Sequence, residues 1–221
     1  MRRFLVFVMC LVCGSSLYAQ TAQLQLEQSL PDSIVYYLPK FEQGRIVYKD
    51  GGFSAGTFNI ATLDQSLRFI SEDKSILSVS NISEVDRVTI GGMMFLRNGS
   101  SFIAVVDNID DVLFGVTRKL EIDNSAKKGA FGMESQTASV TSIGRMQSQG
   151  VNVDFSANAK TRFKESAFIY YKRTALVATK KNFLRAFPSK KELIESYVAE
   201  NKVDFTKYVQ VKALFDYIKT H

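Results

Sequence analysis

The stretch that decides the fold is VDRVTIGGMMFLRNGSSFIAVV, residues 85–106. It contains three short apolar runs, separated by Gly91-Gly92 and by Asn98-Gly99. Glycine adopts the positive φ angles of tight hairpins without strain, and Asn-Gly is the dipeptide best suited to a type I′ turn. Two adjacent hairpin signals therefore predict an antiparallel meander.

The same pattern continues on both sides of this stretch. Upstream, Lys49-Asp50-Gly51-Gly52 separates the runs 46–48 and 53–58. A last hairpin is predicted near the C-terminus, with a turn that contains Lys172-Arg173. The other candidate strands are residues 34–38, 67–70, 76–79, 112–122, 167–171 and 175–178. Most of the chain before residue 180 thus has a β pattern.

Residues 124–160 differ from the rest of this region, because they are rich in Ser, Gln, Gly, Thr and Asn. Their apolar side chains, such as Phe131, are isolated. A structureless connection of that length is uncommon in a compact domain. We therefore expect a polar loop that includes short strands at 138–143 and 151–155.

Residues 187–205, FPSKKELIESYVAENKVDF, have the clearest helical pattern. Ser189 precedes Glu192 by three residues, which is the spacing of a capping box, and Asn201 is a plausible end. A second helix is predicted after it, and a short turn at 182–187 precedes both. The apolar residues at helical spacing are Leu193, Ile194, Tyr197 and Val198 in the first helix and Val211, Leu214, Phe215 and Ile218 in the second.

Together these patterns predict an α+β fold. We expect a mainly antiparallel β meander, either a rolled sheet or sandwich-like, with two or three C-terminal helices packed on it. The predicted organisation is a signal peptide at 1–19, a β-rich body at 20–180 that includes the polar loop, and a helical C-terminal segment at 181–221 that packs on the body.

The first nineteen residues have the layout of a secretory signal peptide. Arg2 and Arg3 precede the apolar run 4–12, and Ala19 offers a small residue for cleavage. That run is about half the roughly 20 residues of a membrane-spanning helix, and no later stretch approaches that length. We therefore expect a chain exported to the periplasm or to the outer-membrane or extracellular side of a Gram-negative cell, with no transmembrane segment after cleavage.

Both cysteines, Cys10 and Cys13, lie within the predicted signal peptide. The cleaved chain would then form no disulfide, and about 200 residues can bury a sufficient core without one. Lipid attachment at Cys13 is disfavoured, because Val12 rather than a small residue precedes it.

Charge is distributed unevenly within the formal total of +6. Residues 160–221 contain 14 Lys and Arg against 6 Asp and Glu, whereas residues 20–159 contain 12 against 16. Lys190, Lys191 and Lys202 lie at the ends of the first predicted helix, whose polar face also carries glutamates. Mixed signs are typical of a solvated face, so we expect no nucleic-acid partner. An anionic glycan or lipopolysaccharide is the alternative partner for the lysines.

Histidine is nearly absent, because His221 is the only one. Relays of the Ser-His-Asp type and nitrogen-ligated metal sites are therefore not expected. Asp107, Asp110 and Asp111 form an acidic cluster between two predicted strands. Such a cluster could serve glycoside hydrolysis or hold calcium, but Asp is also a good turn former, and we favour a loop. We expect no catalytic residue, no cofactor and no metal; a carboxylate-based hydrolase stays open as a third possibility.

Aromatic side chains are the remaining candidates for ligand binding. The chain has no tryptophan, the usual platform for sugars, so tyrosine and phenylalanine would have to replace it. The candidate ligand-binding residues are Tyr36, Tyr37, Tyr170, Tyr171 and Phe131. In a strand, the two members of each tyrosine pair would face opposite sides, one of them toward the core.

Several stretches together resemble a group of exported Bacteroidota proteins of uncharacterised function, which have a β-rich body and a helical C-terminal tail. The matching features are Leu38-Pro39 with Phe41 and Gly44, IVYKDGG (46–52), Phe58-Asn59 before Leu63, VDRVTIGGMMF (85–95), GAFGMESQTAS (129–139) and KKNFLRAFPSKKELIESYVAENKVDF (180–205). The resemblance spans most of the chain after residue 19. It implies export to the cell envelope, and it implies no catalytic residues.

The expected function is that of an envelope interaction or structural protein without catalysis. The alternative is a glycan- or small-ligand-binding module of the cell envelope, which would use the tyrosines and the polar loop. The sequence leaves the partner and the oligomeric state open.

Overall fold

The computed structural model describes residues 30–123 and 160–221. The helices of this part are α2 (Asp32–Val35), α4 (Lys180–Ala186), α5 (Lys191–Asn201) and α6 (Tyr208–Thr220), with 3₁₀ turns η1 (Ile82–Glu84) and η2 (Pro188–Lys190). The strands are β1 (Glu42–Tyr48), β2 (Phe53–Ile60), β3 (Leu67–Ile70), β4 (Ile76–Ser78), β5 (Val85–Ile90), β6 (Met93–Asn98), β7 (Ser101–Ile109), β8 (Val112–Asp123), β9 (Lys160–Tyr171) and β10 (Thr174–Val177).

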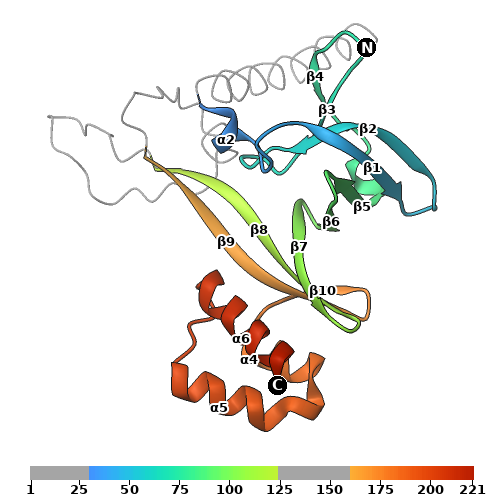
Figure 1. Cartoon of the computed structure of the whole chain (residues 1–221). Coiled ribbons are helices and arrows are strands. Elements are labelled where there is room, and N and C mark those ends of the chain that lie inside the picture. The colour runs from blue at the N-terminus through green and yellow to red at the C-terminus, as the bar shows by residue number, and fades with distance from the viewer. Residues whose placement is uncertain (1–29, 124–159) are drawn as a thin grey trace, which may run out of the picture. The chain divides into compact units, whose positions relative to one another are not determined.

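The strands form one open antiparallel sheet in the order β10-β9-β8-β7-β6-β5-β1-β2-β3-β4 (Figure 1). Strands that follow one another in the chain are neighbours at nearly every step, which confirms the predicted meander. The exception is the step from β4 to β5, because β5 pairs with β1 instead of β4. Among the described strands, β10 and β4 form the two edges of the sheet.

By their contacts, the described residues belong to two units. Residues 30–35, 120–123 and 160–162 belong to one, and residues 36–119 and 163–221 belong to the other. The second unit contains both hydrophobic clusters.

Two tight turns show how local sequence sets the register of the sheet. Gly91 and Gly92 have φ angles of 57° and 84°, and Ile90 pairs with Met93, so the predicted hairpin is present and its glycine turn has type I′ character. At the next turn the prediction is wrong by one residue. Asn98 pairs with Ser101, which leaves Gly99 and Ser100 as the turn, and of these two only Gly99 (φ 59°) has a positive φ. Glycine at the first central position is the signature of a type II′ turn.

One hydrophobic cluster lies on the strands β1, β2, β3, β5, β6, β7 and β8. Its buried members are Ile46, Phe58, Ile60, Leu67, Val85, Val88, Ile90, Phe95, Phe102, Ala104 and Val116. Gly115 is required where β8 pairs with β7, because a Cβ there would lie 2.3 Å from Ile103 Cγ2 and 2.8 Å from the Ala104 carbonyl oxygen. The neighbouring strands can approach this closely only if residue 115 has no side chain.

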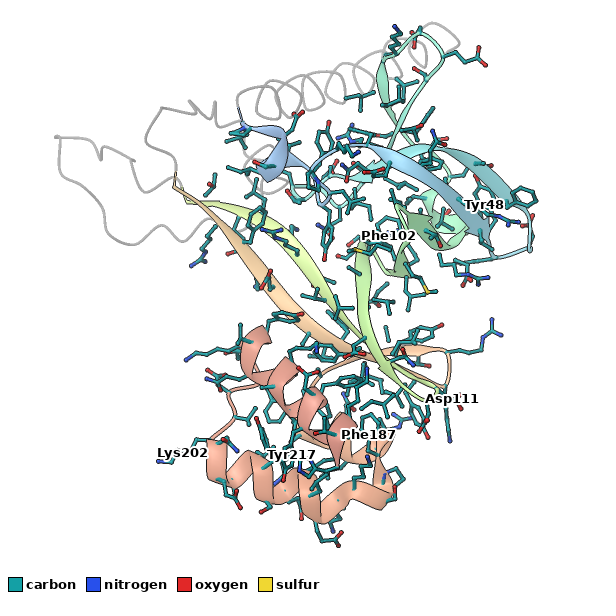
Figure 2. The ribbon with its side chains drawn as sticks, viewed as in Figure 1. Tyr48, Phe102, Asp111, Phe187, Lys202 and Tyr217 are labelled. Atoms are coloured by element: carbon teal, nitrogen blue, oxygen red, sulfur yellow. The ribbon has the colours of Figure 1, made fainter. Side chains whose placement is uncertain are left out.

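The second hydrophobic cluster joins the C-terminal helices to β8 and β9, as the sequence predicts. Phe215 of α6 stacks on Phe114 of β8, with ring centroids 4.7 Å apart. The apolar face of α6 is fully buried, and Phe187 and Tyr217 lie among the helices (Figure 2). The buried members of this cluster are Val112, Phe114, Ala167, Ile169, Ala178, Phe183, Ala186, Phe187, Ile194, Val211, Leu214, Phe215 and Ile218.

Two local predictions are wrong. Residues 34–38 are not a strand: Ile34 and Val35 belong to α2, where the Pro31 carbonyl accepts both of their amide protons, and only Tyr36 forms an isolated bridge, to Ala61. The capping box at Ser189 is also absent, because Ser189 lies inside η2, which has Pro188 as its first residue.

The helices therefore begin in another way. The predicted short turn at 182–187 is the helix α4, which begins at Lys180 because the Thr179 side chain accepts a hydrogen bond from the Asn182 amide at 3.3 Å. Helix α5 begins without a side-chain cap and ends at Asn201, as predicted.

The predicted signal peptide, Phe131 and the predicted strands at 138–143 and 151–155 lie outside the described residues. Within the described ranges, none of the helices has the length and apolar character that crossing a bilayer requires.

Candidate functional site

The first predicted tyrosine pair faces the protein. Tyr36 is 9% exposed and contacts Phe41 edge-on, with ring centroids 4.9 Å apart. Tyr37 is half-buried and meets Phe95 edge-on at 5.2 Å. Neither ring offers an open platform on which a sugar could stack.

Tyr37 belongs to a polar junction, which we define as Tyr37, Arg118, Glu165 and Tyr208. Burial raises the pKa of Tyr37 to about 12, although the charge of Arg118 lowers it. Arg118 Cζ lies 3.8 Å from the centroid of the Phe163 ring, and its Nε is 3.9 Å from Glu165 Oε1. Tyr208 packs against both hydrophobic clusters, and burial raises its pKa too. The polar junction thus connects the two clusters.

The second tyrosine pair lies elsewhere. Tyr170 is paired in register with Ala175 on β10, and Tyr171 packs against the helical cluster, with Lys172 Nζ 5.2 Å from its ring centroid. No contact in the described part of the chain joins this pair to Tyr36 and Tyr37. The structure therefore does not bring the two tyrosine pairs together, and Phe131 lies outside the described residues.

The predicted acidic cluster is divided by the structure. Asp107 lies within β7, next to an irregularity in the pairing with β8, and its side chain is only 18% exposed. It accepts hydrogen bonds from Lys219 Nζ at 2.5 Å and from Lys212 Nζ at 3.4 Å. Asp110 and Asp111 form the β7–β8 turn, as expected. Asp107 is thus not a loop residue, and its carboxylate holds α6 on the sheet.

The pKa of Asp107 reflects this arrangement. Burial raises the pKa, but the hydrogen bonds from Lys219, from the Asn108 amide and from Lys212 outweigh burial and hold the pKa below its usual range. Lys212 is in turn hydrogen-bonded to Asp216 on the next turn of α6. Three charged groups of α6 thus form a network around one carboxylate.

The three lysines that flank α5 have different roles. Lys190 Nζ donates a hydrogen bond to the Ile218 carbonyl oxygen at 2.7 Å, near the end of α6. Lys191 and Lys202 are exposed, and Lys202 points away from the helices (Figure 2). The prediction of a solvated lysine face is therefore wrong for Lys190, because its partner is a main-chain carbonyl that sequence reasoning could not assign to it.

The edge of the sheet at β4 exposes apolar side chains. Ile70 of β3 is 39% exposed, and Ile76 and Leu77 of β4 are 45% and 46% exposed. Ile70 pairs with Ile76 and Phe69 pairs with Leu77, so apolar pairs lie on both faces of the β3–β4 hairpin. We call Ile70, Ile76 and Leu77 the β4 edge. The sequence predicted both strands, but it could not show that β4 lies at the margin of the sheet.

The turn of this hairpin is held by a dense set of hydrogen bonds. The Asp73 carboxylate accepts hydrogen bonds from the hydroxyls of Ser71 and Ser75 and from the Ser75 amide. These bonds lower the pKa of Asp73 to about 2, the Ser71 hydroxyl contributing most. The Ser71 amide also donates to the Ser75 carbonyl at 2.9 Å. These hydrogen bonds within residues 71–75 hold the turn of the hairpin.

A pocket of about 330 Å³ lies near the start of β5, at Val85 and Asp86. It is formed by three segments: the loop after β1, the η1–β5 junction, and the β6–β7 turn. Its lining residues are Lys49, Ser83, Val85, Asp86, Arg97 and Gly99. Because these segments lie far apart in the sequence, no local motif indicates the pocket. We call it the Lys49–Arg97 pocket.

No protein-family model matches this chain, and neither a curated protein nor a solved structure matches it.

Proposed function

We propose that this chain is an exported interaction protein of a Gram-negative cell envelope, and that it acts without catalysis by binding an extended segment of a partner protein along β4. Export is supported by the sequence of residues 1–19, with its paired arginines, apolar run and small residue. The envelope of a Bacteroidota cell is supported by the resemblance described above.

The observation that carries the proposal is the exposure of Ile70, Ile76 and Leu77 on the outermost hairpin of the sheet. Soluble proteins commonly protect an edge strand with charge, proline, a bulge or a covering segment. In β4 the two leading residues are large and apolar instead. Apolar side chains exposed together on both faces of an edge indicate a surface that a partner covers.

An extended segment is the partner that fits this edge. All described strand pairs of the sheet are antiparallel, and β4 has a paired neighbour, β3, on one side only. A further strand would satisfy the outward main-chain groups of β4, while Ile76 and Leu77 would receive its side chains on opposite faces. The Asp73 turn orders the hairpin in advance, which reduces the entropic cost of binding.

The surroundings of Asp107 support a function without catalysis. A catalytic carboxylate needs space for a substrate, whereas Asp107 is mostly buried and directly bonded to Lys212 and Lys219. The polar junction likewise places its tyrosines against packed aromatic rings.

The test compares cross-linking of the tagged chain in intact cells of its own host with that of two variants. The double substitution Ile76→Lys with Leu77→Lys places charge on the β4 edge. Val209→Lys is the matched control, because Val209 is an apolar residue that is 76% exposed on α6, away from the edge. We expect one discrete adduct in the envelope fraction, lost in the double variant and kept in the control.

In the purified adduct, the main-chain amides of residues 76–78 should exchange their hydrogens more slowly than in the free chain. Equal adducts in both variants would contradict the β4 interface. An adduct that contains two copies of this chain and no other protein would show self-association in place of binding to a partner protein. Recovery of the chain only in the cytosolic fraction would contradict export.

A further inference from the structure

The charges around the Lys49–Arg97 pocket do not cancel. Neither Lys49 nor Arg97 forms an ion pair with any residue of the ranges 30–123 and 160–221. Asp86 lines the pocket, but its carboxylate is paired with Arg87 Nη1 at 2.9 Å. The lining residues thus include two cations without carboxylate partners, and this excess of positive charge would attract an anion.

Ser83 does not change this balance in the pocket. Its hydroxyl donates a hydrogen bond to Glu84 Oε1 at 3.3 Å, and the Glu84 side chain is exposed and does not line the cavity. The Lys49 amide donates to the Glu84 carbonyl at 2.9 Å, which ties the loop after β1 to the start of β5. The wall that carries Lys49 is thus held by the main chain.

Arg97 is held in place from the opposite strand. It pairs in register with Phe102 of β7, and its Cζ lies 5.4 Å from the centroid of that ring, which is 2% exposed. Cation–π contact orients the guanidinium and leaves its N–H groups free to bind other atoms. Arg97 is half-buried, and this burial lowers its pKa. A partly desolvated cation gains more from an incoming anion than a fully hydrated one does.

We propose that the Lys49–Arg97 pocket binds an oxyanion, the carboxylate or phosphate group of a small ligand. The planar guanidinium of Arg97 suits two oxygens of such a group at once, and Lys49 adds a mobile point charge. A volume of about 330 Å³ lies at the small end of the range for ligand pockets, so it accommodates a group of the size of one sugar or one amino acid. The site is independent of the β4 edge.

The experiment uses two probes, inorganic phosphate and galacturonate, which carry the two oxyanions that the pocket would accept. Amide NMR of the full chain follows the Gly99 resonance, because Gly99 lines the pocket. Each titration is matched in ionic strength with sodium chloride. We expect a saturable shift with at least one probe and no saturable shift with chloride. Saturation by phosphate alone assigns a phosphate ligand, and saturation by galacturonate alone assigns a carboxylate.

Variants then test the two cations. Arg97→Gln and Lys49→Gln should each lower the affinity for the bound probe by about tenfold or more, because each removes a charge-assisted hydrogen bond. Arg45→Gln is the control: Arg45 is exposed on β1 and stacks on Phe53, and its substitution should leave the affinity unchanged. Arg97→Lys keeps the charge and removes the planar fork, so it should bind with intermediate affinity and keeps the test valid if Arg97→Gln fails to fold.

Three results would overturn the assignment. They are the absence of saturation with both probes, an equal response to chloride, and an unchanged affinity in folded Arg97→Gln or Arg97→Lys.

Discussion

The ammonium group of Lys219 and the carboxylate of Asp107 lie 2.5 Å apart, although 112 residues separate them in the sequence. Lys212 reaches the other oxygen of the same carboxylate. One acidic residue of β7 thus receives two cations from α6 and fastens the last helix of the chain to the sheet. Asp107 thus has a structural role in holding α6 on the sheet.

Asp107→Asn should lower the free energy of unfolding by about 1–2 kcal/mol, because the variant loses charge-assisted hydrogen bonds at a mostly buried position. Asp111→Asn is the matched control, since Asp111 is exposed in the β7–β8 turn and should change stability by less than about 0.5 kcal/mol. Urea denaturation measures both. Equal losses in the two variants would show that the ion pairs contribute nothing.

Acid should erase the difference between the wild type and Asp107→Asn. The folded state holds the pKa of Asp107 below its ordinary value, so its contribution to stability is complete above that ordinary value. The contribution is lost as the pH falls through the lowered pKa of the folded state. Denaturation curves of both proteins, recorded over a falling pH series, should therefore converge. A gap of constant size would contradict the assignment.

Lys190→Met should destabilise the protein by about 1 kcal/mol. The substitution keeps much of the aliphatic stem but removes the hydrogen bond to the Ile218 carbonyl and a positive charge near the C-terminus of α6, where the helix dipole favours one. Lys191→Met changes the adjacent, exposed lysine and should be nearly neutral. Thermal unfolding of the two variants checks the prediction. A larger loss of stability in Lys191→Met than in Lys190→Met would contradict it.

Alkali should weaken the fold through Tyr37. Burial raises its pKa from 10.0 to about 12, so the folded state favours the neutral phenol. The stabilisation is complete below about pH 10 and is lost as the pH rises toward the folded pKa of about 12. Tyr37→Phe should flatten the fall in unfolding free energy over this interval, whereas Tyr170→Phe should leave it in place. Phenolate absorbance gives an independent measure of the late-titrating group.

Gly115→Ala should destabilise the sheet by about 1–3 kcal/mol, because the new methyl group would overlap Ile103 Cγ2 and the Ala104 carbonyl. Part of that loss should be relieved in the Ile103→Ala background, where the side-chain contact is gone. A double-mutant cycle of unfolding free energies measures the coupling. Strict additivity would show that Gly115 is not limited by Ile103.

Sequence patterns could not predict the candidate sites, because each site depends on how segments that are far apart in the chain are arranged. Arg97 and Lys49 are unremarkable in sequence, and they line one pocket only because β1 and β6 both lie beside β5. Ile76 and Leu77 read as ordinary strand residues, and they are exposed because β4 is the last strand of the sheet. The tyrosine pairs were predicted from composition, and the structure places them apart.

The sequence by itself determined the local events: the glycine turn at 91–92, the β pattern of the body, and the apolar faces of α5 and α6. Each depends on backbone conformation and on side-chain spacing within a few residues, which neighbouring positions encode directly. Only the tertiary structure decided that Lys190 caps α6, that Asp107 holds it, and that β4 is an edge. These depend on strand order and on contacts across tens of residues, and no local preference specifies either.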